Sequence, residues 1–337
     1  MAEIIRRIED TDFEAVSAFY NGRKSIEELK WLFTNPDDPG VYNAFVATKE
    51  SKIVGVIGYV LSDYVQDKRI FSGTIPISWK IESHYKGMAG VLLFKKVMNL
   101  GEFGITIAGS ETAKDLYTLF KYKYVSNIEH FYKILNLKNT YKSLHRKNFI
   151  KTLGMFGYLL PSYFSNSKDS ALYKDIELIK YDGSNYVEDV KYDSVLKKQT
   201  NKNYIDWLLA CPILKPHAFI IKKENEFLGT GVLYIKEEKN IRKGRIVHLP
   251  YLGEDLKIWE SVIEKCIAFL KEEGCCIIES VAHNRINQEA YKKTGFINIQ
   301  KHSKPLYIKD SKELLRKVDL KNWFLQYSEG DKSYRSF

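Results

Sequence analysis

The chain resembles itself at an offset of about 174 residues, and this faint internal repeat constrains its fold more than any other feature. The corresponding residues keep their order over about a hundred positions, namely Trp31 with Trp207, Phe45 with Phe219, Val54 with Leu228 and Tyr117 with Tyr291. Such ordered self-similarity predicts two copies of one ancestral domain. Two unrelated α/β domains with similar turns remain the alternative. At 337 residues the chain is long enough for either arrangement.

The sequence predicts an N-terminal domain over 1–138, a helical connector over 139–174 and a C-terminal domain over 175–337. Both domains read as β-α-α-β-β-β-α-β-α-β, a mixed α/β (α+β) fold in which each domain has a mixed, mostly antiparallel sheet flanked by helices. Capping boxes at Thr11 to Glu14 and Ser25 to Glu28 begin the first two helices. The further N-terminal elements are expected at 42–48, 53–61, 69–81, 91–100, 105–108, 111–120 and 124–137.

The predicted connector is basic and rich in aromatic residues, with His145-Arg-Lys-Asn and Met155-Phe-Gly-Tyr among its residues. One interpretation is an amphipathic helix on a membrane or partner surface. The other, which the interruption at Pro161 favours, is an interdomain helix packed against both halves. The two interpretations predict opposite exposure for its apolar residues.

Charge and cysteine content restrict the partners and the compartment. Lysine and arginine exceed aspartate and glutamate by 52 − 42 = 10, which favours an anionic partner such as a nucleotide, coenzyme, phospholipid or RNA. The excess is spread along the chain, so DNA is not expected. Four cysteines without disulfide or metal spacing predict buried thiols in a reducing cytoplasm. No signal peptide or membrane-spanning segment is apparent, and a homodimer remains open.

A glycine-containing turn between Tyr85 and Val91 joins an expected strand to an expected helix. Small residues there allow a tight turn, and the amide groups at the helix N-terminus can bind a phosphate. The turn is neither a Walker loop nor a G-x-G-x-x-G dinucleotide fingerprint. Its presence alone therefore indicates only a candidate anion site.

The residues downstream of this turn make the chain similar to the GNAT superfamily of N-acyltransferases. That superfamily binds acyl-CoA at an Arg/Gln-x-x-Gly-x-Gly/Ala turn, followed by a helix that begins at an Asn and holds an Ala and a Tyr shortly before Gly-Phe. The N-terminal copy matches the turn with Lys86 to Val91 and the later helix with Ser110, Ala113 and Tyr117. The C-terminal copy matches the later helix with Asn284, Tyr291, Gly295 and Phe296.

Each copy departs from the pattern in a different place. In the N-terminal copy Lys86 replaces Arg or Gln, Ala89 and Val91 replace glycines, and Lys121-Tyr122 replaces Gly-Phe. In the C-terminal copy two carboxylates, in Tyr251-Leu-Gly-Glu-Asp255, lie where a pyrophosphate would bind and would repel it. The sequence therefore predicts one coenzyme site, in the N-terminal domain, and a degenerate site in the C-terminal domain.

The resemblance implies a set of site residues in the N-terminal copy. Tyr117 would be the general acid, with Glu82 and His84 as candidate bases. The main chain of Trp79, Lys80 and Ile81 would bind the pantetheine arm. The remaining coenzyme-binding residues implied by the resemblance are Lys86, Gly87, Met88, Ala89, Gly90, Val91 and Ser110.

The implied activity is transfer of an acetyl or other acyl group from acyl-CoA to a primary amine. The expected acceptor is an amino sugar, nucleotide-linked, of a bacterial surface-polysaccharide pathway, bound in a pocket at the domain interface. One alternative is a Fem-type transferase, which joins two such domains and uses aminoacyl-tRNA. Another is a non-catalytic binding or regulatory protein. The scattered histidines show no metal-ligand spacing, so no metal is expected.

Overall fold

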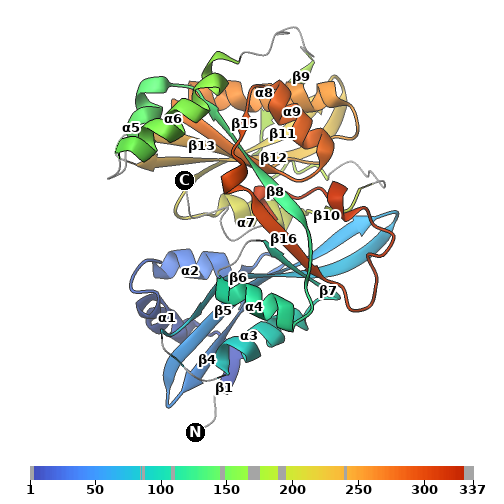
Figure 1. The fold of residues 1–337 in the computed structure, drawn as a ribbon. Coiled ribbons are helices and arrows are strands. Elements are labelled where there is room, and N and C mark those ends of the chain that lie inside the picture. Colours follow the sequence, from blue (N-terminus) through green and yellow to red (C-terminus); the bar gives the residue numbers. More distant parts are fainter. Residues whose placement is uncertain are drawn as a thin grey trace.

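The computed structural model describes residues 4–83, 85, 88–107, 111–144, 149–165, 175–188, 195–238 and 241–329. They form an N-terminal lobe and a C-terminal lobe that lie against each other (Figure 1). The elements as far as the eighth strand are β1 (Ile4–Arg7), α1 (Phe13–Phe19), α2 (Ile26–Phe33), β2 (Thr34–Asn35), β3 (Asp38–Tyr42), β4 (Ala44–Lys49), β5 (Lys52–Gln66), β6 (Arg69–Ile81), α3 (Ala89–Met98), β7 (Phe103–Ile107), α4 (Glu111–Leu119) and β8 (Lys123–Ile134).

The later elements run in a related order through the second lobe. They are α5 (Leu137–Leu144), α6 (Phe149–Phe164), β9 (Ile176–Lys180), β10 (Lys197–Lys198), α7 (Lys202–Leu209), β11 (Lys215–Lys223), β12 (Glu226–Glu238), β13 (Ile241–His248), α8 (Leu256–Glu272), β14 (Cys275–Ala282), α9 (Arg285–Lys293), β15 (Ile297–Asn298) and β16 (Lys304–Lys309).

Local sequence explains where several of these elements begin and turn. Ser25 accepts a hydrogen bond from the Glu28 amide and caps α2, as the capping box predicts. The β4–β5 hairpin turns at Glu50 and Ser51, which both have positive φ angles, as tight hairpin turns require. Asn201 caps α7 and Asn284 caps α9 in the same manner as Ser25.

The described strands form one continuous fourteen-stranded sheet and a separate β2–β3 hairpin. Most neighbouring strands in the sheet are antiparallel, and the β6–β7 and β13–β14 pairs are parallel. The predicted mixed α/β class with a mostly antiparallel sheet flanked by helices is therefore confirmed. The sheet is shared between the lobes, whereas the sequence suggested one sheet for each half.

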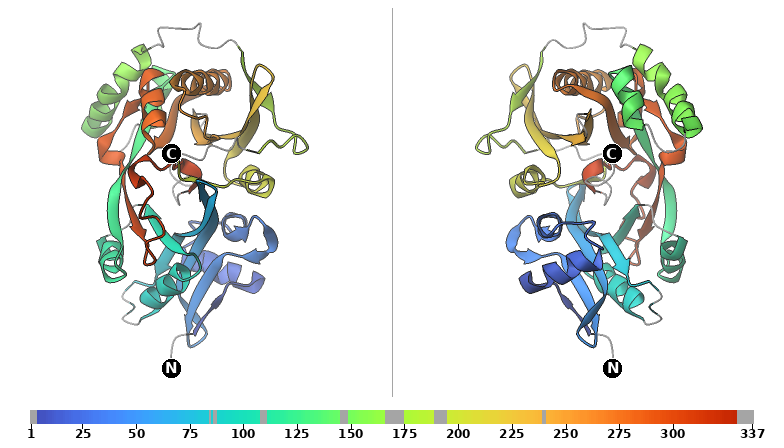
Figure 2. Two further views of the ribbon diagram at one scale, coloured as in Figure 1. Left: turned by 90° about the vertical axis from the view of Figure 1, so that its right-hand side faces the viewer. Right: turned by 90° about the vertical axis from the view of Figure 1, so that its left-hand side faces the viewer.

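The two lobes share their sheet because β8 and β16 each reach out of their own part of the sequence. The first half of β8 pairs with β16, and its second half pairs with β14 in the C-terminal lobe. β16 follows the C-terminal helices in sequence but lies between β7 and β8, in the N-terminal lobe. In Figure 1, β8 runs from one lobe into the other, and β16 lies beside its lower part, next to β7. Figure 2 shows the same passage of the chain between the lobes from two sides. The predicted boundaries at 138 and 175 stay a prediction, and so does the duplication.

Helices cover both faces of the N-terminal part of the sheet. A Cβ added at Gly58 would lie 2.4 Å from Phe33 of α2, and one at Gly55 would lie 2.8 Å from Leu93 of α3. Both distances are too short for a real contact, so these glycines permit close packing of α2 and α3 on β5. In the predicted connector, α5 and α6 pack on β8, β14 and β15 of the C-terminal lobe.

The lobes meet at the pair of tryptophans that the internal repeat aligns. The rings of Trp31 and Trp207 stack with centroids 5.0 Å apart and planes 11° from parallel. Each indole N–H donates to the main-chain carbonyl of the other residue, at 2.7 and 2.8 Å. Both side chains are buried, so these hydrogen bonds satisfy two indole N–H groups away from water.

Replacing Trp207 by Phe should destabilise the folded chain by about 1–3 kcal/mol, because the buried contact between the lobes then loses the indole hydrogen bond to the Trp31 carbonyl. The free energy of unfolding in urea measures this loss. Phe227→Leu, at an exposed site, is the control and should change stability by less than about 0.5 kcal/mol. Equal stability of Trp207→Phe and the parent protein would show that the indole hydrogen bond contributes nothing to lobe packing.

Candidate functional site

Strands β6 and β7 are paired at one end and separate at the other. Their parallel pairing is confined to Gly73 with Phe103 and Thr74 with Gly104. β6 continues as far as Ile81 alongside β5, while β7 continues alongside β16. The two strands diverge beyond these pairs, and we call the interval between them the β6–β7 gap; main-chain groups along it have no ladder partner from the other strand.

A β-bulge interrupts β6 where it borders this gap. The β5–β6 register shifts between Val56 and Gly58, opposite Ser78, whose φ angle is +49°. Two buried side chains hold the bulge: the Tyr20 hydroxyl donates to the Ser78 carbonyl, and the Lys24 ammonium donates to the Ser78 hydroxyl. A left-handed serine costs about 1–3 kcal/mol, and bulges often redirect groups beside active sites.

Trp79, Lys80 and Ile81, which the sequence predicted to bind the pantetheine arm, form the end of β6 after the bulge. Trp79 stacks on Phe94 of α3 with centroids 5.2 Å apart, and its indole N–H is buried without a partner among the described residues. The Lys80 ammonium donates to the Phe19 carbonyl and lies 4.8 Å from the Phe19 ring centroid. The Lys80 side chain is therefore directed at α1, while Ile81 pairs with Gly55 of β5.

The N-terminus of α3 lies directly beside this strand end. A Cβ on Gly90 would be 3.3 Å from Ile81 and 3.6 Å from Trp79, so glycine lets the helix approach the strand closely. Met88 is the N-cap residue, and its side chain makes no capping hydrogen bond. Ala89 is buried and Val91 half-buried, and the amides of the first helical turn have no acceptors within the helix.

Some of the predicted site residues lie outside the described residues, namely His84, Lys86, Gly87 and Ser110. Glu82 is described and exposed, and its amide donates to the Val54 carbonyl at 3.0 Å. Its carboxylate follows directly after β6. The role of Glu82 and of His84 as a base stays a prediction.

Tyr117 lies in an aromatic cluster on the side of the gap opposite β6. Its ring packs beside Phe94, Tyr122 and Tyr307, with centroids 5.3–6.0 Å away, and is 6% exposed. Burial raises the pKa of the Tyr117 phenol above its ordinary value, and the neighbouring Thr106 hydroxyl opposes this rise. The phenol is therefore protonated at neutral pH, as a proton donor must be.

Four functional candidates were missed by the sequence analysis: Tyr20 and Lys24, which hold the bulge; Ser78, which forms it; and Tyr307, which packs against Tyr117. Tyr307 belongs to β16, far along the chain from the rest of the cluster. No local motif marks these residues, since their roles depend on long-range packing. The β-branched and aromatic run over 69–81 gave no sign of the bulge within it.

The arrangement suits an elongated ligand with an anionic end. The helix N-terminus offers amides and a positive dipole end to a phosphate. The unpartnered Trp79 indole N–H and the close approach allowed by Gly90 lie on the path from that terminus to the bulge. These features fit a pantetheine arm with its pyrophosphate at α3, with Trp79, Gly90 and the α3 amides as the residues that would hold it.

The second parallel pair, β13 and β14, also separates after its paired residues, but the chain itself fills the space beyond. Pairing ends at Arg245 with Glu279. The Gln326 side chain bonds to the Leu249 amide and to His248, and Tyr327 donates to Glu279 at 3.1 Å. Burial lowers the pKa of His248 to about 3, so its imidazole is neutral there.

The helix ends beside β13 and β14 are occupied as well. Asp255 caps α8 through a hydrogen bond from the Lys257 amide at 2.9 Å, so a carboxylate occupies the N-terminus of that helix. The side-chain amide of Asn284 donates to both oxygens of Asn322, at 2.9 and 2.7 Å. Tyr291 is buried, and its hydroxyl accepts a hydrogen bond from the Ser280 hydroxyl at 2.7 Å.

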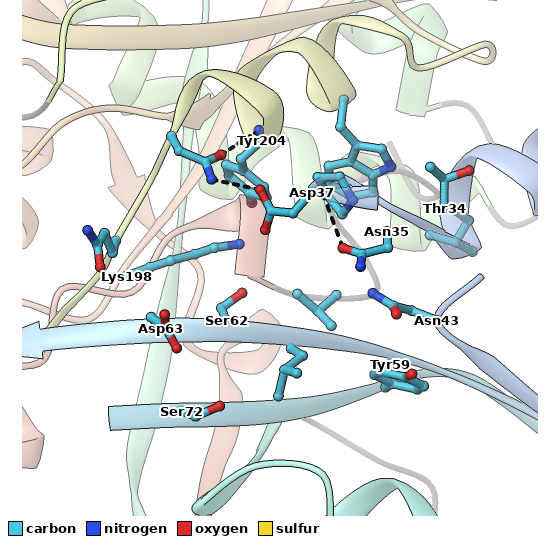
Figure 3. A pocket seen from close by; sticks show the side chains of 17 residues that line it. Thr34, Asn35, Asp37, Asn43, Tyr59, Ser62, Asp63, Ser72, Lys198 and Tyr204 are labelled. Atoms are coloured by element: carbon cyan, nitrogen blue, oxygen red, sulfur yellow. Dashed lines mark hydrogen bonds between the residues drawn. The ribbon is translucent and has the colours of Figure 1, made fainter. Parts of the chain in front are cut away.

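A cavity of about 360 Å³ lies between the lobes, at the edge of β5 (Figure 3). Its lining comes from α2 and the α2–β3 turn, from β5, from Ser72 of β6 and from the stretch from β10 to α7. It borders the β5 edge that faces away from β6, whereas the β6–β7 gap lies on the far side of β6. The cavity and the gap are therefore separate features.

Neither a metal-binding cluster nor a membrane-spanning helix is found within the described ranges. No cluster of three or more histidine, cysteine, aspartate or glutamate side chains there is arranged to hold a metal ion. None of the described helices has both the length and the apolar character needed to cross a bilayer.

Comparisons with known proteins identify the fold. No protein-family model matches the chain, and neither does any curated protein. Among solved structures, it is similar to a GCN5-related N-acetyltransferase from Anabaena variabilis (TM-score 0.58, 8% identity, covering 91% of this chain and 72% of that one). It is also similar to Saccharomyces cerevisiae N-myristoyltransferase with bound myristoyl-CoA (TM-score 0.55, 10% identity, covering 91% and 79%). The chain therefore has the GNAT fold.

Proposed function

We propose that the protein is an N-acyltransferase that transfers an acyl group from acyl-CoA to a primary amine. The observation that carries the proposal is the β6–β7 gap, bordered by the Ser78 bulge and the N-terminus of α3. Solved structures of the same fold include acetyltransferases and a myristoyltransferase with bound myristoyl-CoA. Transfer of an acetyl group is the simplest form of this activity.

The coenzyme would lie along the gap with its pyrophosphate at the helix. Backbone amides from Lys86 to Val91 would bind the pyrophosphate, assisted by the helix dipole. The main chain of Trp79 to Ile81 would pair with the pantetheine arm, and Ser110 is a further proposed coenzyme-binding residue. Placement of the thioester near the bulge would bring its sulfur toward Tyr117.

The reaction follows from this placement. The amine nitrogen attacks the thioester carbonyl carbon, and the carbon–sulfur bond then breaks. The Tyr117 phenol donates its proton to the departing thiolate, and Glu82 or His84 takes the amine proton, directly or through water. The products are an amide and free coenzyme A, so no covalent enzyme intermediate is needed.

We propose a single coenzyme site, in an N-terminal domain over 1–138, with a connector over 139–174 and a C-terminal domain over 175–337 that arose by duplication. The equivalent gap beyond Arg245 and Glu279 is filled by Gln326 and Tyr327, which supports this asymmetry. The four cysteines are buried free thiols, in keeping with a reducing cytoplasm as the site of the reaction.

The acceptor is proposed to be an amino sugar, as the sequence suggested. The reacting amine must come within about 3–3.5 Å of the thioester carbonyl. The interlobe cavity lies at the β5 edge and reaches β6 at Ser72, whereas the gap lies beyond Thr74 on the other edge of β6, so the cavity is not where we place the reacting amine. Use of aminoacyl-tRNA and a non-catalytic role are the alternatives that binding measurements would separate.

Replacing Met88 by Asp tests the coenzyme site. Aspartate is a good N-cap residue, so the variant should fold at least as stably as the parent. Its carboxylate would repel the pyrophosphate, and acetyl-CoA affinity should fall at least about tenfold. Calorimetric titration measures the affinity, and thermal unfolding measures the stability.

The matched control is Met88→Asn, which also caps the helix but carries no charge and should keep the affinity. Equal affinity of both variants would contradict the proposed pyrophosphate position. Binding of tRNA without binding of acetyl-CoA would favour the aminoacyl-tRNA alternative. If the parent binds neither, a non-catalytic role is favoured.

Replacing Tyr117 by Phe should lower kcat about 10²–10⁴-fold and leave KM for acetyl-CoA nearly unchanged, because only the proton donor is lost. Since the folded pKa of Tyr117 is raised, the phenol stays protonated past its ordinary pKa of 10.0, and the parent rate should not fall on the alkaline side below that pH. Steady-state kinetics over a pH series measures both effects.

Tyr122→Phe is the control because it removes a second hydroxyl from the same aromatic cluster, and its kcat should stay of the same order as the parent's. A similar loss in both variants would show that packing, rather than proton donation, explains the Tyr117 effect.

A further inference from the structure

The interlobe cavity surrounds a stretch of β5 that has no neighbouring strand on one edge. On that edge β4 pairs with β5 as far as Gly58, and β10 pairs with it from Tyr64 onward. Residues from both faces of the intervening stretch, including Val60, Leu61 and Ser62, line the cavity. A cavity lined from both faces of one strand encloses that strand's edge.

The main-chain groups at this edge can be assigned from the bonds at either end. The Tyr59 amide donates to the Asn43 carbonyl at 2.9 Å, and the Asp63 carbonyl accepts from the Gln199 amide at 2.8 Å. Alternate residues of a strand point the same way, so the amide and carbonyl of Leu61 face the cavity too. Neither group of Leu61 has a hydrogen-bond partner outside the strands in the described part of the chain.

The three aromatic residues of the cavity lining, Tyr59, Tyr204 and Trp207, are already packed against other side chains. Trp207 lies between Trp31, at 5.0 Å, and Tyr204, at 5.6 Å, and the buried Tyr59 stacks on Phe45, at 5.6 Å. The Lys198 ammonium lies 3.4 Å from the centroid of the Tyr204 ring. Because a sugar ring is usually held by an open aromatic face together with polar groups, this column of side chains disfavours a sugar as the occupant.

The polar lining favours a ligand with a positive charge and amide groups. Asp37 and Asp63 line the cavity, and the Asp37 carboxylate is held by the Asn201 side chain at 2.8 Å. Figure 3 shows Ser62 on the β5 side of the cavity and Asp37 above it. Lys198 is the lysine among the described residues that line the cavity, and its ammonium lies over the Tyr204 ring.

We propose that this cavity is a peptide-binding site in which an extended, positively charged polypeptide segment pairs with the free edge of β5. Strand addition at a sheet edge is a general mode of peptide recognition, with main-chain bonds providing affinity. The stretch from Tyr59 to Asp63 spans about 13 Å at about 3.3 Å per residue. A five-residue segment matches that length, with a cationic side chain directed at Asp37.

The site goes beyond the acyl transfer proposed above and does not depend on it. Its main-chain groups belong to the β5 edge facing away from β6, while the proposed coenzyme site lies beyond β6. Loss of one function by substitution should therefore leave the other intact, and peptide binding can be measured without acyl-CoA.

The test is an amide NMR titration of the full chain with a blocked Ala-Lys-Ala-Lys-Ala pentapeptide at millimolar concentration. Binding should shift the Leu61 and Asp63 amide signals. Two N-methylated peptides distinguish strand pairing from charge attraction, because alternate amides of an added strand face the sheet. Methylation of one alternating set should weaken binding at least about fivefold, and methylation of the other set should not.

The matched protein variants are Asp37→Asn, which should weaken binding of the lysine peptide, and the neighbouring Asp38→Asn, which lies outside the cavity lining and should not. The proposal is overturned if no peptide binds, if both methylated peptides bind equally well, or if glucosamine shifts the same signals and the pentapeptide does not.

Discussion

The exchange of β8 and β16 between the lobes is the constraint on which the rest of the structure depends. Backbone hydrogen bonds run without a break from β7 through β16 and β8 to β14. A strand inside a sheet is bonded on both edges, so removing either strand would expose polar main chain in both lobes. Neither lobe has its complete set of strands without a segment from the other half of the sequence.

The exchange also builds the candidate active site. β16 forms the outer neighbour of β7 and brings Tyr307 against Tyr117, so the wall opposite β6 contains a residue from the C-terminal half. After β16 the chain returns between the lobes, where Trp323 contacts Tyr64 and Phe103 from the N-terminal half. The next residues of that segment fill the β13–β14 gap. One strand crossing thus helps to shape the first gap and leads into the segment that fills the second.

A buried charged cluster of Arg245, Glu279 and Tyr327 lies at the filled β13–β14 gap. Loss of one of its members would leave a buried charge poorly compensated. Arg245 is fully buried and pairs with Glu279, which also accepts from Tyr327. The Arg245 guanidinium lies 4.4 Å from the Tyr327 ring centroid. A buried ion pair requires such additional partners to offset desolvation. The C-terminal segment supplies one of them, so displacing it to admit a coenzyme would leave Glu279 less well satisfied.

Local patterns in the sequence were sufficient for the order and type of most elements, because caps, turns and alternation act over a few residues. The Ser25 capping box, which begins α2, is an example. The position of β16, the bulge at Ser78 and the filling of the second gap could not be predicted, since each depends on contacts between residues far apart. The coenzyme turn was predicted only through its resemblance to a family. The sequence predicted a pocket at the domain interface, but it did not predict that the unpaired edge of β5 would line it.

Hydrogen–deuterium exchange with and without acetyl-CoA tests the central claim, that one of the two equivalent gaps is open to a coenzyme and the other is closed by the chain itself. We expect slower exchange in peptides covering 75–92, where main-chain amides would bind the ligand, and no change over 246–258. Slower exchange over 246–258, or no change over 75–92 at saturating acetyl-CoA, would contradict it.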